Sequence, residues 1–127
     1  QWEALATYLQ PFSIAESQAL ITQGSQDRTV YFIETGSLSV HYEDDAGRVR
    51  LAILGAGSAV GEGGFFSHLP RSATVQAVSA CKLWRLTPMK FAELSNRQPV
   101  IALALVMGLG GLVARRMTDQ RKRIAVT

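Results

Sequence analysis

The sequence predicts a mainly β domain of the α+β class. Turn residues separate a series of short β-type runs, and helical patterns lie at both ends of the chain. The runs cover residues 19–23, 29–34, 37–43, 48–54, 74–79 and 81–87. Several short strands at this spacing favour a barrel or a sandwich.

A short helix is expected at the N-terminus, over residues 2–9 of an N-terminal segment 1–11. Trp2, Leu5 and Leu9 fall on one helical face, and Pro11 stops the pattern. We expect this helix to pack as a lid on the strands that follow.

Helical signals return after residue 87. Pro88 suits a first helical turn, and Phe91 with Leu94 supplies an apolar face. A second break at Pro99 begins a long helix to about Ile124, which is apolar in its first half and charged in its second. This change in composition predicts that the first half of the helix is buried and that the second half is exposed to solvent.

Glycines and one polar loop mark the turns between the predicted strands. Glycines stand where the chain must reverse, at Gly24, Gly36, Gly47, Gly55 and Gly57. Glycine adopts positive φ at little steric cost. The loop 44–47 separates two partly alternating runs, so residues 37–43 and 48–54 are predicted to pair as an antiparallel hairpin.

Composition narrows the class of protein. The chain has 127 residues, 47% hydrophobic and 18% charged, which fits one folded domain. Its net charge is +3, but residues 115–123 carry +4 of it and leave −1 for the rest. A basic nucleic-acid surface on the body of the domain is therefore not expected.

Cysteine and hydropathy patterns favour a cytoplasmic domain without a membrane span. The single cysteine, Cys81, cannot form an internal disulfide or a four-cysteine metal site. The uncharged segment 100–114 is shorter than the roughly 18 apolar residues of a spanning helix. Because the chain starts at Gln1 and ends in a basic run, we interpret it as a fragment whose effector domain lies elsewhere.

The chemistry is concentrated in residues 60–75. Adjacent Gly63 and Gly64 let an anion approach backbone N–H groups where a short helix begins. Arg71 can close the other side with a bidentate contact to phosphate. Glu62 accepts hydrogen bonds only, so it fits a ligand that also offers a hydroxyl, such as a ribose 2′-OH.

This stretch resembles the phosphate-binding cassette of the cyclic-nucleotide-binding domain family. The family pattern is Gly-Glu, then small and apolar residues, then Arg-(Ser/Thr/Ala)-Ala. Residues 31–33 (Tyr-Phe-Ile) before Gly36, and residues 54–57 (Leu-Gly-x-Gly), are also similar to the family. Phe91 with Leu94, and Pro99, fall where the family has its B helix and the start of its last helix.

The resemblance covers about residues 12–118 and implies the architecture. It implies an antiparallel β-roll, a jelly-roll-like double-stranded barrel, over residues 12–87 with a short cassette helix within 60–75. B and C helices would occupy residues 88–127. The implied function is a regulatory sensor without catalytic activity, cofactor or metal, which binds cAMP or cGMP and signals through its last helix to an attached effector.

The resemblance also implies the site residues: Gly61, Glu62, Gly63, Gly64, Arg71, Ser72 and Ala73. Arg71 would bind the cyclic phosphate and Glu62 the ribose 2′-OH. The glycine backbone would line the pocket, and Ser72 with Ala73 would complete the phosphate contact. Ser72, in place of the threonine common in cGMP-preferring kinases, favours cAMP.

Two departures from the family pattern bear on binding. The acidic residue often found directly after the first conserved glycine is here Asp27, three positions after Gly24. Bulky Phe65 and Phe66 would narrow the pocket. An internal ion pair between Arg71 and Glu62 is the alternative to phosphate binding.

Several other residues could suggest a catalytic or ligand-binding role, but their positions favour a structural one. His68 is expected to face solvent in a loop, with His41 on a distant strand, so neither supports a metal or a hydrolase. Ser72 lacks a catalytic partner in the motif. Phe32 and Trp84 are expected in the core.

Two alternative functions stay open. One is that the chain is the sensor half of a catabolite activator-type transcription regulator, and the other is that it is a β-roll that serves in protein interaction or dimerisation without ligand. Under the leading hypothesis the attached effector could equally be a transporter, a channel or an enzyme. Small residues at Ala104, Gly108, Gly110 and Ala114 would also let a second copy approach the last helix as a homodimer.

Overall fold

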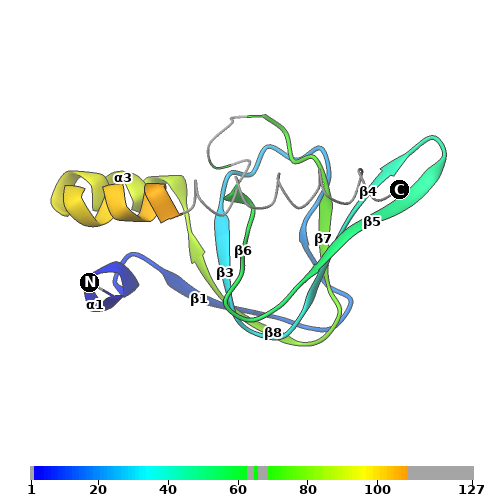
Figure 1. Ribbon diagram of the computed structural model, residues 1–127, viewed down its shortest axis with the longest axis horizontal. Coiled ribbons are helices and arrows are strands. Elements are labelled where there is room, and N and C mark those ends of the chain that lie inside the picture. Colours follow the sequence, from blue (N-terminus) through cyan, green and yellow to red (C-terminus); the bar gives the residue numbers. More distant parts are fainter. Residues whose placement is uncertain (1, 63–64, 66–68, 109–127) are drawn as a thin grey trace.

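Two antiparallel four-stranded sheets form the body of the protein in the computed structural model, which describes residues 2–62, 65 and 69–108. One sheet contains, in spatial order, β1 (Gln10–Ile14), β8 (Cys81–Leu86), β3 (Val30–Thr35) and β6 (Ala59–Val60). The other contains β2 (Ala19–Ile21), β7 (Thr74–Ala77), β4 (Leu38–Asp44) and β5 (Gly47–Leu54). The sheets fold over each other as a β-roll (Figure 1), which confirms the predicted fold class.

All of the predicted strands are present, and the structure adds β1 and β6. The N-terminal helix is shorter than predicted, because α1 (Trp2–Ala6) ends before Leu9. Pro11 lies inside β1 instead of ending a helix. Proline lacks an N–H donor, but β1 is an edge strand whose one neighbour is β8, so the sheet tolerates it.

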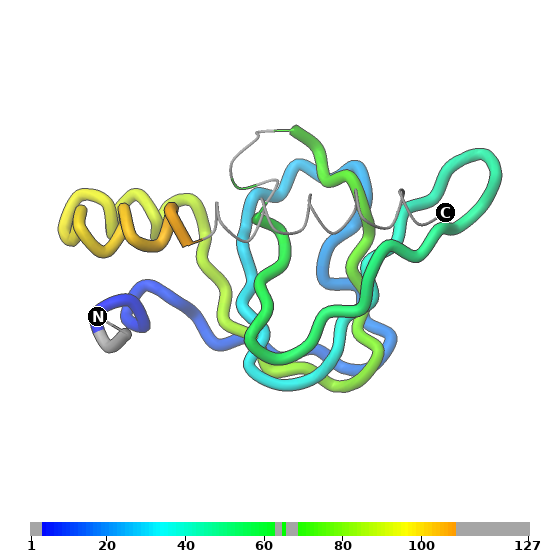
Figure 2. The backbone as a smooth tube through the Cα atoms, viewed as in Figure 1, coloured from blue at the N-terminus to red at the C-terminus, as the bar shows by residue number. Residues whose placement is uncertain are grey.

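The predicted hairpin is confirmed. β4 and β5 pair antiparallel in the register that places Asp44 opposite Gly47, with an irregularity between Val40 and His41. The hairpin projects at one end of the molecule, and the described helices lie at the other (Figure 2). Of the predicted turn glycines, Gly55 is the exception without a positive φ, and Gly61 joins the set.

The interior of the roll is a single apolar cluster built from both sheets. Leu38 of β4 and Leu83 of β8 are 0% and 1% exposed within it. Gly36 allows β8 to approach closely, since a Cβ at this residue would lie 2.5 Å from the carbonyl oxygen of Ala80. Its φ of 100° also favours glycine.

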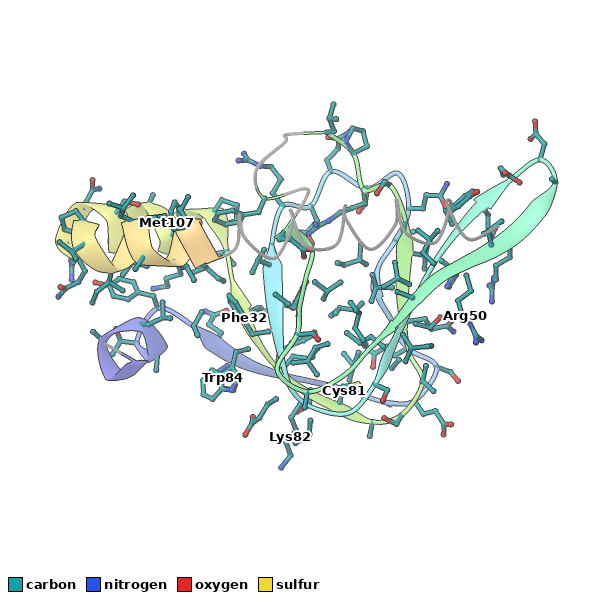
Figure 3. All side chains as sticks on the ribbon, in the orientation of Figure 1. Phe32, Arg50, Cys81, Lys82, Trp84 and Met107 are labelled. Atoms are coloured by element: carbon teal, nitrogen blue, oxygen red, sulfur yellow. The ribbon has the colours of Figure 1, made fainter. Side chains whose placement is uncertain are left out.

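A second apolar cluster joins the outer face of the β1–β8–β3 sheet to the helices. Phe32 pairs with Trp84 across β3 and β8, and both pack against this cluster together with Leu5 of α1. Figure 3 shows the two aromatic side chains on the side of the sheet that faces α1. Both side chains are only partly buried and pack at the edge of this cluster, so the structure places them beside the core and not fully within it.

The C-terminal helices begin as predicted. α3 (Pro88–Arg97) has Thr87 as its N-cap, and the Thr87 hydroxyl accepts from the Lys90 N–H at 3.2 Å. A second helix covers residues 99–108, and its expected continuation to about Ile124 lies outside the described residues. Among the described residues, no helix is long and apolar enough to cross a membrane.

Candidate functional site

The cassette leaves the roll after β6 and returns to it at β7 (Figure 1). Gly61 turns the chain with a φ of 88°, and Glu62 and Phe65 are helical, as the expected cassette helix requires. The predicted site residues Gly63 and Gly64 lie outside the described residues. The expectations for Phe66 and His68 fall there too.

Gly61 fits tightly against the neighbouring chain. A Cβ at this residue would lie 2.7 Å from the carbonyl oxygen of Thr29 and 3.0 Å from Nη1 of Arg71. Its own carbonyl oxygen accepts from the Phe65 N–H at 3.2 Å, which begins the helical turn. Glycine is therefore required both for the positive φ and for the close packing of the Arg71 side chain.

Arg71 is the centre of the site and is 5% exposed. Its Nη1 donates to the Gly61 carbonyl oxygen at 2.8 Å, and its Nη2 donates to the Thr29 carbonyl oxygen at 2.5 Å. Its backbone N–H donates to the carbonyl oxygen of Ser25 at 2.8 Å. Arg71 thus joins the end of the cassette to the loop between β2 and β3.

Arg71 forms an ion pair with the carboxylate of Asp27, a residue that the sequence did not place in the site. Nη2 of Arg71 lies 3.4 Å from Oδ2 of Asp27. The sequence missed this contact because Asp27 stands two positions later than the family pattern places its acidic residue, and only the path of the loop brings it back to Arg71.

Asp27 is held in its ionised form. Partial burial favours the neutral acid, but the hydrogen bonds from Thr29 and the charge of Arg71 outweigh it and lower the pKa of Asp27 below its ordinary value. The Thr29 N–H donates to Oδ1 of Asp27 at 3.1 Å. One oxygen of the carboxylate thus caps the loop while the other faces Arg71.

One donor of Arg71 is left over. Nε is buried and has no hydrogen-bond partner among the described residues, although both Nη atoms donate. A buried donor without a partner is destabilising by about 1–3 kcal/mol. An anionic oxygen beside Nε would satisfy it without breaking either carbonyl contact.

The remaining predicted site residues lie around Arg71. Glu62 is 5% exposed, so its carboxyl group is buried next to the Gly61 turn. Ser72 is exposed and Ala73 partly buried, and both follow Arg71 just before β7. Within the described part of the chain, Gly61 and Arg71 are in contact. Glu62, Ser72 and Ala73 are their neighbours along the chain.

The ring of Phe65 lies in the second apolar cluster, which joins the β1–β8–β3 sheet to the helices and is called the helix-side cluster below. It is 7% exposed and meets Phe91 of α3 edge to face, with 5.1 Å between ring centroids. The same cluster contains Leu86 and, partly buried, Leu105 of the last described helix. Phe65 therefore connects the cassette to both C-terminal helices, a role that the sequence did not predict.

His41 is buried, at 3% exposure, on β4. It lines a groove of about 520 Å³ together with Gln23 and Thr74. No group of three or more His, Cys, Asp or Glu side chains within the described residues is placed to hold a metal ion.

Comparison with known proteins assigns the family. A family model described as the cyclic nucleotide-binding domain matches residues 11–98, which run from Pro11 of β1 to the end of α3 and include the whole cassette. The chain belongs to the cyclic nucleotide-binding domain family. Gly61, Glu62 and Arg71 of the cassette lie within the matched range.

Curated relatives in this family are transcription regulators. The chain is 36% identical over 107 residues to the cAMP-activated global transcriptional regulator CRP of Salmonella typhimurium, covering 83% of this chain and 49% of that protein. It is 32% identical over 110 residues to the cAMP-activated global transcriptional regulator Vfr of Pseudomonas aeruginosa, covering 83% and 50%. The chain thus spans about half the length of these relatives.

Solved structures share the fold. A cyclic nucleotide-binding domain from Methylobacillus flagellatus has a TM-score of 0.91 at 24% identity, over 96% of this chain and 69% of that chain. The catabolite activator protein of Thermus thermophilus has a TM-score of 0.82 at 24% identity, over 98% and 57%. The regulatory domain of Toxoplasma gondii PKA, solved with cAMP, has a TM-score of 0.68 at 31% identity, over 72% and 35%.

Proposed function

We propose that this cyclic nucleotide-binding domain binds cAMP in preference to cGMP and reports its occupancy to an attached effector. The observation that carries the proposal is the buried Arg71 guanidinium, whose Nε has no hydrogen-bond partner among the described residues. The phosphate of a cyclic nucleotide would accept from Nε as a charge-assisted hydrogen bond. The cAMP-activated relatives support the choice of nucleotide.

The other site residues take complementary roles in this proposal. Glu62 accepts a hydrogen bond from the ribose 2′-OH, and the backbone of Gly61, Gly63 and Gly64 lines the pocket. Ser72 adds its hydroxyl and Ala73 its N–H to the phosphate. The domain has no catalytic activity of its own in this account, because each of these groups binds and none activates a nucleophile.

Signal output would pass through Phe65. A nucleotide that binds Arg71 and Glu62 acts on the same short turn that carries Phe65, which packs on Phe91. A ligand shifts the equilibrium between two conformations of a protein only as far as it binds one more tightly than the other. The Phe65–Phe91 contact must therefore differ between the ligand-free and the ligand-bound conformation. Hydrogen exchange with saturating cAMP should change protection at residues 61–73 and from residue 99 onward. A response confined to the cassette would refute this output route.

The effector is proposed to lie outside this chain, which we interpret as one cytoplasmic domain of a longer protein. A DNA-binding effector is favoured, because the relatives that match over half their length are transcription regulators. The fragment itself is proposed to bind neither nucleic acid nor membrane.

A homodimer through the last helix is the proposed assembly. Val100, Leu103 and Met107 are 72%, 62% and 69% exposed, and their spacing places them on one stripe of the helix. Figure 3 marks Met107 on this helix. Leu103→Glu should produce a monomer in sedimentation velocity, whereas Met89→Glu, at a site 74% exposed on α3, should not. A dimer that survives Leu103→Glu would refute the interface.

Calorimetric titration with cAMP and cGMP tests the function directly. We expect saturable 1:1 binding of cAMP and weaker binding of cGMP. Tenfold tighter binding of cGMP would reverse the assigned preference. Binding of neither nucleotide would favour the alternative, a β-roll that acts in protein interaction without ligand.

A further inference from the structure

The proposed phosphate site contains a negative charge of its own. Asp27 lies 3.4 Å from Nη2 of Arg71, and its side chain is 44% exposed while that of Arg71 is 4% exposed. The carboxylate therefore offsets the positive charge that would attract an anionic ligand. Every negative charge on a ligand bound to Arg71 is attracted by the guanidinium and repelled by Asp27.

We propose that Asp27 makes this site selective for the singly charged phosphodiester of a cyclic nucleotide over the doubly charged phosphomonoester of a 5′-nucleotide. This inference rests on the proposed function of Arg71. A cyclic phosphodiester carries one negative charge, whereas a phosphomonoester carries about 1.5 to 2 at neutral pH. The second charge gains less from Arg71 than it would if Asp27 were absent.

The geometry lets Asp27 act by charge and not only by holding Arg71 in place. The contacts of the guanidinium to the carbonyl oxygens of Gly61 and Thr29 do not involve the side chain of residue 27, so we expect them to remain when its charge is removed. An asparagine at residue 27 would also retain an oxygen to accept from the Thr29 N–H. Asp27→Asn therefore removes the charge with little disturbance of the loop.

The size of the effect follows from Coulomb's law. A phosphate oxygen on Nε and a carboxylate on Nη2 of one guanidinium place their charges about 6 Å apart, given ordinary hydrogen-bond lengths. Because Asp27 is partly exposed, solvent screens the interaction, and a dielectric constant of about 40 to 80 applies. Each additional ligand charge then changes affinity by a factor of about three to ten.

The test compares cAMP with 5′-AMP by competition calorimetry on the wild type, Asp27→Asn and a matched control, Asp45→Asn. Asp45 is exposed at the tip of the β4–β5 hairpin, so the control makes the same change in net charge away from the site. The readout is the ratio of the two affinities. Any displacement of Arg71 that weakens phosphate binding in general affects both ligands and largely cancels in this ratio.

We expect the preference for cAMP over 5′-AMP to fall by about twofold to tenfold in Asp27→Asn, because the monoester carries about half to one extra charge, and to stay unchanged in Asp45→Asn. An unchanged ratio in Asp27→Asn would overturn the inference, and so would 5′-AMP binding that is undetectable in both proteins at millimolar concentration. An equal shift in Asp45→Asn would also overturn it, because the effect would then follow net charge. If the wild type binds no cAMP, the proposed function itself fails and this inference fails with it.

Discussion

Arg71→Ala should weaken both the fold and ligand binding, because the guanidinium is part of each. The substitution removes the donors to the carbonyl oxygens of Thr29 and Gly61. Each buried carbonyl left without a donor is destabilising by about 1–3 kcal/mol. The lost pair with Asp27 adds little, since that carboxylate is 44% exposed and solvent screens it. The free energy of unfolding should therefore fall by about 2–6 kcal/mol.

The same variant should lose most of its affinity for cAMP. It removes the buried cation assigned to the phosphate, and the loss of one partner from such a desolvated charge pair costs about 2–5 kcal/mol of binding free energy. Urea denaturation without ligand measures the first effect. Calorimetry, at a temperature where the variant is folded, measures the second.

Arg48→Ala is the matched control for both measurements. Arg48 pairs with Glu43 at 3.4 Å, but the two side chains are 60% and 62% exposed. Removing this exposed pair should change stability by no more than about 1 kcal/mol and leave cAMP affinity unaltered. Wild-type affinity in Arg71→Ala would refute the phosphate assignment, and stability equal to that of Arg48→Ala would refute the role of Arg71 in joining the cassette to the β2–β3 loop.

Three further predictions follow from other residues. Glu62→Gln should bind cAMP about three to ten times more weakly by calorimetry, since the amide oxygen accepts without charge assistance; 2′-deoxy-cAMP should bind both proteins equally, and a remaining difference would place Glu62 elsewhere. Gly36→Ala should lower the free energy of unfolding by about 2 kcal/mol or more, because its φ is positive and the Cβ would meet Ala80. Gly55→Ala, at an open position, is its control, and equal stabilities would contradict the close approach. The lowered pKa of Asp27 means that its ionised form stabilises the fold above about pH 4 and that this contribution is lost as the pH falls further. Urea denaturation between about pH 5 and pH 3 should therefore show a smaller loss of unfolding free energy in Asp27→Asn than in the wild type. An equal loss in the two proteins would contradict the stabilising role of the Asp27 carboxylate.

The sequence predicted the fold class and the position of the cassette, because both depend on local patterns. Alternating runs and turn glycines indicate strands and reversals, and Gly61, Glu62 and Arg71 stand at a recognisable spacing. β6 was missed because Ala59–Val60 is too short to show alternation. β1 was missed because Pro11 is as typical of a helix end as of an edge strand.

Contacts between distant segments could not be predicted from the sequence. The Asp27–Arg71 pair joins residues 44 positions apart and depends on the path of the β2–β3 loop. The packing of Phe65 on Phe91 depends on how the cassette turn meets α3. The sequence supplied a reason for Phe65 to narrow the pocket, whereas the structure places its ring in the helix-side cluster.

NMR of the arginine side chains tests whether the cyclic phosphate accepts a hydrogen bond from Nε of Arg71. The ¹⁵Nε–¹H resonance of Arg71, assigned by comparison with Arg71→Lys, should shift on titration with cAMP and saturate together with the calorimetric binding curve. The exposed Arg48 supplies an internal reference whose resonance should not move. Saturable binding of cAMP with the Arg71 resonance unchanged would place the phosphate elsewhere and contradict the account.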